Sequence, residues 1–98
     1  MIVRLVKMEF KPEEIENFQI LFEGVKEKIR NFEGCMFLEL LNGADQPTLF
    51  FTHSYWSSTE ALEKYRKSQL FRTTWAETKA LFNAKPEAWS VEKLVSLQ

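Results

Sequence analysis

The segments with the composition of β-strands carry apolar side chains on both of their faces. Successive side chains of a strand point to opposite faces, so a sheet with one face in water alternates apolar and polar residues. The stretch 35–41 places Cys35, Phe37 and Leu41 on one face and Met36, Leu38 and Leu40 on the other. The stretch 48–56 places Leu49, Phe51 and Tyr55 on one face and Phe50 and Trp56 on the other. A sheet built from such strands needs cover on both faces.

Two helical stretches accompany these strands. Apolar residues recur at spacings of three and four between about Pro12 and Asn31, which predicts one amphipathic helix. Pro12 suits a first helical turn. The segment Ser57-Ser58-Thr59-Glu60 resembles a capping box, so a second helical stretch begins near Ser58. Ser68 is a further candidate cap, which predicts a break near Lys67-Ser68 before the stretch ends at Lys85-Pro86.

The predicted elements follow the order of a ferredoxin-like split βαβ fold. Strands are expected at 2–10, 35–41, 48–56 and 88–95, with the middle two forming a hairpin around Asn42–Pro47. This order predicts an α+β fold with a four-stranded antiparallel sheet and helices on one face. We expect one domain over residues 1–98. Because the helices cover only one face, we expect a second copy to cover the other in a homodimer.

Charge and cysteine content exclude several classes of function. The chain has 13 basic and 14 acidic residues, a formal net charge of −1, and no basic block that would capture nucleic acid. No stretch approaches the ~20 apolar residues of a membrane span. Cys35 is the only cysteine, so no intrachain disulfide forms, and we expect a cytoplasmic protein with neither a nucleic acid nor a membrane partner.

Several segments, in their order along the chain, resemble the antibiotic biosynthesis monooxygenase domain of the dimeric α/β-barrel superfamily. They are Phe10-Lys11-Pro12-Glu13, Phe32-x-Gly34-Cys35, Ser54 to Ser58, Ala61 to Phe71, and Lys85-Pro86. The resemblance covers roughly Ile2 to Val95, and the part from Trp56 to Phe71 is the most specific. It implies a dimer whose two sheets face each other as a barrel, and an oxygenase that acts on phenols or quinols without metal or flavin.

The haem-degrading branch of this family uses an Asn, a Trp and a His at positions that correspond to Val6, Tyr65 and Trp75. All three residues differ here, so the resemblance argues against haem breakdown. The quinol-oxidising branch often has a His at the position of Tyr65, which is a second departure from the family pattern.

His53 and Tyr65 are the candidate catalytic residues. His53 is the only histidine, and its unperturbed pKa of about 6.5 suits a general base that takes a phenolic proton. Its alternative role is a hydrogen-bonded histidine at the dimer interface or sheet edge. Tyr65 offers a hydroxyl and Trp75 an indole N–H to a flat aromatic ligand in a cleft between helices and sheet. Ordinary core packing is the alternative for both.

Other residues complete the candidate set. Phe71, Trp56 and Phe51 are candidate substrate-binding residues, with core packing as the alternative for Phe71 and Trp56. One histidine and one cysteine predict no metal site, and we expect no cofactor. Arg66 and Arg72 could steer an anionic substrate, Glu9, Glu39 or Glu92 could act as the base if it faced the cleft, and Cys35 is a candidate nucleophile. Their alternative roles are structural: Cys35 as a buried apolar residue, the two arginines on a solvated helix face, and the glutamates pointing to water.

Two functions therefore stay open. One is a cofactor-independent monooxygenase for a small phenol, quinol or polyketide-like aromatic, with His53 or a carboxylate in the cleft as the base. The other is a non-catalytic dimer that binds a small molecule or serves in a stress response. A void lined by Tyr65, Trp75 and His53 would favour ligand handling.

Overall fold

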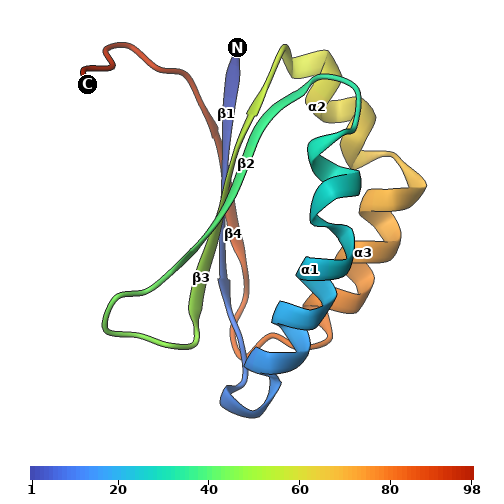
Figure 1. Cartoon of the computed structure of the whole chain (residues 1–98), viewed down its shortest axis with the longest axis vertical. Helices are drawn as coiled ribbons and strands as arrows, with labels where there is room; N and C mark the ends of the chain where they lie inside the picture. The colour runs from blue at the N-terminus through green and yellow to red at the C-terminus, as the bar shows by residue number, and fades with distance from the viewer.

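The computed structural model describes residues 1–98 and has two layers, a four-stranded sheet with all helices on one side of it (Figure 1). The elements are β1 (Ile2–Glu9), the 3-10 turn η1 (Pro12–Glu14), α1 (Ile15–Arg30), β2 (Cys35–Asn42), β3 (Leu49–Trp56), α2 (Thr59–Arg66), α3 (Gln69–Lys79) and β4 (Glu87–Val91). All strand pairs are antiparallel, in the order β2-β3-β1-β4. The predicted α+β ferredoxin-like fold is confirmed.

The second helical stretch is divided where the sequence predicts. Ser58 caps α2 by accepting a hydrogen bond from the Ala61 backbone N–H at 3.1 Å, and Ser68 caps α3 through Phe71 N–H at 3.1 Å. The helix α2 begins at Thr59 with Ser58 as its cap, next to the predicted start near Ser58. None of the helices is long and apolar enough to cross a lipid bilayer.

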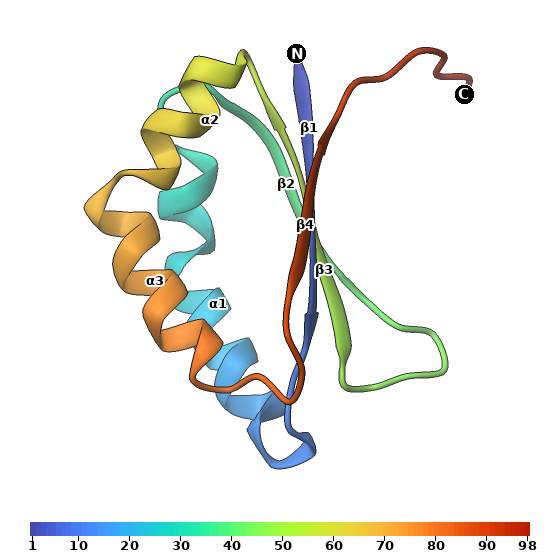
Figure 2. The same ribbon diagram turned by 180° about the vertical axis from the view of Figure 1, so that it is seen from behind.

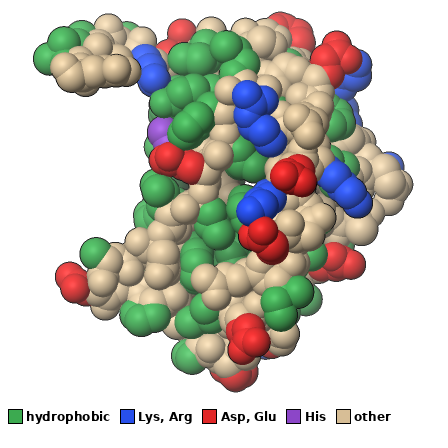
Figure 3. Space-filling view, viewed as in Figure 1, with side chains coloured by type: hydrophobic (Ala, Val, Ile, Leu, Met, Phe, Trp, Pro, Cys, Tyr) green, Lys and Arg blue, Asp and Glu red, His purple; other side chains and the backbone are tan.

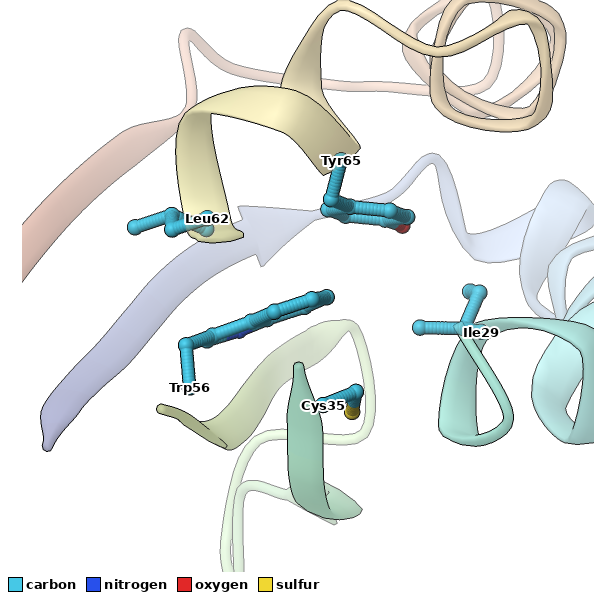
Figure 4. Packing of buried hydrophobic residues seen from close by; sticks show 5 residues of the cluster. All are labelled: Ile29, Cys35, Trp56, Leu62 and Tyr65. Atoms are coloured by element: carbon cyan, nitrogen blue, oxygen red, sulfur yellow. The ribbon is translucent and has the colours of Figure 1, made fainter. Parts of the chain in front are cut away.

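Two clusters of buried side chains join the helices to the sheet. One contains Trp56, Leu62 and Tyr65 together with Ile29 and Cys35, and Figure 4 shows the ring of Tyr65 lying over that of Trp56. The other is centred on Phe10, which is fully buried and stacks on Phe18 with ring centroids 4.1 Å apart; Met8 and Phe50 complete it. Because the two clusters lie at opposite ends of the layer, they hold the helices against the sheet at both ends.

Two strands differ from the prediction. A bulge in β2 shifts the register between Cys35 and Phe37, so Cys35 joins the cluster beneath the helices while Phe37 stacks on Tyr55 on the far face. Strict alternation had put both on one face, which is wrong. β4 ends at Val91 and not at Val95. Val91 pairs with Val3, and because β1 begins at Ile2, it leaves almost no residues with which a longer β4 could pair.

No helix covers the sheet face away from α1, α2 and α3, and from the C-terminal tail Lys93 lies over the ring of Tyr55, with its Nζ 4.2 Å from the ring centroid. Figures 1 and 2 show the β2–β3 loop and the C-terminal tail both projecting to this side. Figure 3 shows the resulting hollow at its left edge, with the only histidine among hydrophobic side chains. We call this surface the open face and define it by these residues: Val3, Leu5, Lys7, Phe37, Glu39, Leu41, Phe51, His53, Tyr55, Glu87, Trp89 and Val91.

Candidate functional site

A cavity of about 250 Å³ lies between the sheet and the helices. Most of its lining is apolar, and every element except η1 and β4 contributes a large side chain to it or to the core around it. From β4 only Ala88 reaches it, and all β4 residues are exposed, so the cavity opens to solvent beside this edge strand. An apolar cavity of roughly 150 Å³ accepts benzene, which makes the present one suitable for a molecule of one or two rings.

The sequence places Tyr65 in the cavity wall through α2. The Ser58 cap fixes the first turn of α2, and Leu62 and Tyr65 on its inner face are buried. Beneath Tyr65 the indole of Trp56 stacks at 4.8 Å, and its N–H donates to the Ser54 hydroxyl at 3.0 Å. Trp56 is only 1% exposed, so it serves mainly to position the phenol ring above it.

The aromatic pair Phe71 and Trp75 forms the second wall, on α3. Their rings are stacked 5.8 Å apart at an interplanar angle of 11°, one helical turn from each other. Phe82 closes the outer side of Trp75 with ring centroids 5.6 Å apart. The stacked pair gives the cavity an apolar aromatic wall that can contact an aromatic ligand.

Tyr65 acts in this cavity as a neutral phenol. Burial raises its pKa far above the ordinary value of 10.0, and the nearby Cys35 raises it further. The hydrogen bond at this position is made by its backbone carbonyl, which accepts from the Ser68 hydroxyl at 2.6 Å. The phenol hydroxyl is therefore a hydrogen-bond donor for a ligand, and it is not a base near neutral pH.

No imidazole or carboxylate lines the cavity. Its charged lining groups are Arg4 and Arg66, and its other polar groups are the hydroxyls of Thr52, Ser54, Thr74, Thr78 and Tyr65. The predicted carboxylate candidates Glu9, Glu39 and Glu92 all lie outside the lining. The chain also holds no cluster of three or more His, Cys, Asp or Glu side chains that could bind a metal ion.

The structure separates the predicted site residues into two groups. Tyr65, Trp75, Phe71 and Trp56 line the cavity together. His53 and Phe51 do not, because they occupy odd positions of β3 and point to the open face, whereas Trp56 occupies an even one. The expectation that His53 shares a cleft with Tyr65 and Trp75 is therefore wrong.

His53 is engaged with a carboxylate on the open face. Its Nδ1 lies 3.2 Å from Oε1 of Glu39, its direct neighbour across the β2–β3 pair. The imidazole is 23% exposed and contacts the rings of Phe37 and Tyr55 edge to face. A substrate held in the cavity would have the whole sheet between it and this histidine.

The remaining candidates are placed as follows. Cys35 is buried in the core outside the cavity, and burial raises the pKa of its thiol, which leaves it protonated and unreactive. Arg72 is exposed and donates to the Gln69 side chain at 3.3 Å. Arg66 lies at the cavity, on the same side as a residue that was not predicted, Arg4.

The alternation of side chains along β1 indicates from the sequence alone that Arg4 points toward the helices. Arg4 shares its strand face with Val6 and Met8, since all three are even positions of β1, and this is the face under the helices. A charged residue at an inward position of an apolar strand is costly unless it is paired or hydrogen-bonded, so such a position indicates a candidate binding residue. The three positions matched to the haem-degrading branch, Val6, Tyr65 and Trp75, also all line the cavity.

The comparisons with known proteins agree with this architecture. The model of the antibiotic biosynthesis monooxygenase family matches residues 1–77. A crystal structure of an antibiotic biosynthesis monooxygenase superposes with a TM-score of 0.90 at 19% identity, covering 97% of this chain and 100% of the other. A conserved protein from Methanosarcina mazei Go1 gives a TM-score of 0.88 at 20% identity over 95% and 93% of the two chains.

A third structure, Rv0793 from Mycobacterium tuberculosis, has a TM-score of 0.88 at 16% identity over 99% of this chain and 98% of its own. At these identities the superpositions establish the fold. No curated protein matches the chain significantly in sequence.

Proposed function

The chain belongs to the antibiotic biosynthesis monooxygenase family, and on that premise we propose that it is a monooxygenase for a small phenol, quinol or polyketide-like aromatic. The observation that carries this proposal is the apolar cavity of about 250 Å³ walled by Tyr65, Phe71 and Trp75. Enclosure of a flat ring by aromatic walls with a few polar groups is typical of small-molecule sites.

In the proposed reaction the substrate itself supplies the electrons that reduce O₂. A substrate with two removable hydrogens reacts with O₂ to give the oxygenated product and one water. One oxygen atom bonds to the substrate carbon, and the other leaves as water with the two hydrogens. The substrate is thereby oxidised, and no external reductant is needed. Deprotonation comes first, because the anion is the electron-rich form that O₂ oxidises.

The residues of the chain bind, orient and shield the ring. Phe71 and Trp75 hold one face of it, and Tyr65 donates a hydrogen bond to a substrate oxygen. The apolar lining excludes water from the reacting atoms, which strengthens each polar contact inside. Trp56 acts through Tyr65 by fixing its ring, and is a positioning residue.

The same arrangement argues against haem breakdown. The position that corresponds to the iron-binding histidine is Trp75, whose indole cannot ligate iron. The only histidine, His53, lies on the opposite face of the sheet. We also place the protein in the cytoplasm, where its single buried thiol stays reduced.

We further propose that a second copy of the chain covers the open face. Trp89 and Val91 on β4 are 43% and 40% exposed, and Leu41 on β2 is 43% exposed, so this sheet face presents apolar side chains to water. The tail beyond β4 projects to the same side and carries Leu94 and Leu97, 93% and 89% exposed. A two-fold dimer brings one patch against its own copy and gives both tails an apolar partner.

The rival function is a non-catalytic dimer that binds a small aromatic molecule. The observation that favours it is the lack of an imidazole or carboxylate in the cavity. The two functions differ in whether bound ligand reacts with O₂, which a direct measurement decides.

Oxygen uptake by the metal-free protein, measured with an oxygen electrode across a panel of quinols and anthrones, tests the proposal. We expect uptake that depends on substrate and saturates. Ala88→Trp fills the mouth of the cavity and should abolish it, whereas Ala76→Trp, on an exposed part of α3 outside the lining, should not. An absence of uptake across the panel, with ligand binding retained, would establish the rival.

A further inference from the structure

Two arginines lie at the cavity without a matching set of carboxylates. Arg4 on β1 is partly buried, and its guanidinium makes one hydrogen bond within the chain, to the Ser90 hydroxyl on β4 at 3.1 Å. A guanidinium carries five N–H donors, so most of those of Arg4 are unused. No carboxylate lies within ion-pair distance of Arg4. The ion pairs of the chain all lie elsewhere, on the exposed surface or on the open face.

The second guanidinium adds to the positive charge at this point. Burial lowers the pKa of Arg4, and the nearby positive charge of Arg66 on α2 lowers it further. The negative charge of Glu63 acts in the opposite direction. Arg66 donates to Glu63 at 2.9 Å, but both side chains are more than 40% exposed, and such surface pairs contribute little. The cavity is therefore lined by two like charges with one carboxylate at its solvent side.

The cavity has no group that would accept a proton from a ligand. Tyr65 is held neutral, and the other hydroxyls that line the cavity are not bases. The proposed reaction nevertheless requires a deprotonated substrate. A positive charge held in a partly buried position, as that of Arg4 is, stabilises a bound anion and so performs this task without a protein base, and the exposed Arg66 adds to this charge from the solvent side.

We propose, as an extension of the proposed monooxygenase function, that Arg4 and Arg66 bind the phenolate oxygen of the substrate and so make the cavity selective for the anionic form. When a phenol binds, its O–H bond breaks and the proton passes to solvent at the mouth beside β4. The electron pair stays on the oxygen, which accepts N–H donors from the two guanidinium groups. Arg4 and Arg66 are thus the specificity-determining residues of the cavity.

The test uses para-nitrophenol, whose anion absorbs at longer wavelength than the neutral phenol. The ligand is titrated with pH in the absence of oxygen, with and without an excess of protein. We expect the pKa of the bound probe to fall by about one unit or more, which corresponds to at least tenfold tighter binding of the anion. Nitrobenzene, a neutral ligand of similar shape, should bind more weakly than the anion.

Three variants assign the effect to the pair. Arg4→Gln and Arg66→Gln should each reduce the shift, and Arg4→Lys should restore part of it by returning the charge without the fork of donors. Arg72→Gln, on the solvated side of α3, should behave as the wild type. Circular dichroism confirms that each variant is folded. Arg66 is exposed, so its variant remains informative even where the Arg4 variants unfold.

Defined outcomes would overturn the inference. One is an unshifted or raised probe pKa on binding, or no binding of either form. Another is tight binding of para-nitrobenzoate with no shift for the phenol, which would assign the pair to a carboxylate. A lowered probe pKa without oxygen uptake on any substrate would keep the anion site and remove the monooxygenase proposal, so the two failures are distinguishable.

Discussion

Tyr65 is the residue in which packing and the proposed chemistry meet. Its ring stacks on Trp56 and meets Phe32 and Phe71 edge to face, and Figure 4 shows its hydroxyl on the side of Ile29, which also lines the cavity. The aromatic surroundings that hold the ring in place also remove water from the hydroxyl, which raises its pKa. Position and protonation state therefore have one physical cause.

Because of Tyr65, the free energy of unfolding should decrease as the pH rises in the alkaline range. Its folded pKa is raised above the unfolded value of about 10, so above pH 10 the unfolded chain releases a proton that the folded chain retains. The free energy of unfolding consequently falls as pH rises from there. Between pH 9 and pH 11 we expect the free energy of unfolding to fall by about 1 kcal/mol less in Tyr65→Phe than in the wild type. Urea unfolding at the two pH values measures this.

Tyr55→Phe is the matched control, because it removes a phenol from the open face. The free energy of unfolding of Tyr55→Phe should fall between pH 9 and pH 11 by the same amount as that of the wild type. Equal pH dependence of the wild type and Tyr65→Phe would show that the Tyr65 hydroxyl is hydrated.

The sequence predicts which side chains belong to the site better than it predicts their grouping. Tyr65, Trp75, Phe71 and Trp56 reach the cavity because helix periodicity and the caps at Ser58 and Ser68 are local signals. The separation of His53 from them follows from strand parity. Parity fails at Cys35, where the bulge depends on pairing with β3 and has no signature in the strand itself.

At the level of the elements, the connection between α1 and β2 depends on one glycine. Gly34 has φ of 92°, a region that side chains disfavour, and a Cβ there would lie 2.5 Å from Cβ of Ala61 on α2. Its carbonyl also accepts the Ser57 backbone N–H at 2.8 Å. Gly34 therefore sets how closely α2, which carries Tyr65, approaches the sheet.

Substitution of two glycines tests this role. Gly34→Ala should lower the free energy of unfolding by roughly 2 kcal/mol or more, through backbone strain and the contact with Ala61. Gly24→Ala lies within α1 with open space around it, and should raise the free energy of unfolding by about 0.5–1 kcal/mol. Denaturant unfolding of both variants measures the difference. A harmless Gly34→Ala would mean that the connection adapts freely.

For the whole molecule, the two faces of one sheet are assigned to two tasks. The helices enclose a ligand cavity against one face, and a second copy is proposed to cover the other. The requirement for two covers follows from strands that are apolar on both sides, which the sequence already indicates. The place of the cavity between the helices and the sheet could be predicted, but whether it is open could not, because its volume depends on how far the helices stand from the sheet.

The dimer proposal predicts different effects for two exposed apolar residues. Trp89→Glu places a charge on the open face and should weaken self-association about tenfold or more. Ile20→Glu alters an apolar residue that is even more exposed, 63% against 43%, on the outer side of α1, and should leave association unchanged. Sedimentation equilibrium over a range of concentrations measures both. Equal behaviour of the two variants would place the interface elsewhere.

A crystal structure of the protein soaked with para-nitrophenol tests the central claim most directly, because it locates the ligand and the interface together. We predict the ring against Phe71 and Trp75, its phenolate oxygen at Arg4 and Arg66, and the open face buried against a second copy. A ligand bound beside His53, or an open face left bare to solvent in a monomer, would contradict the account.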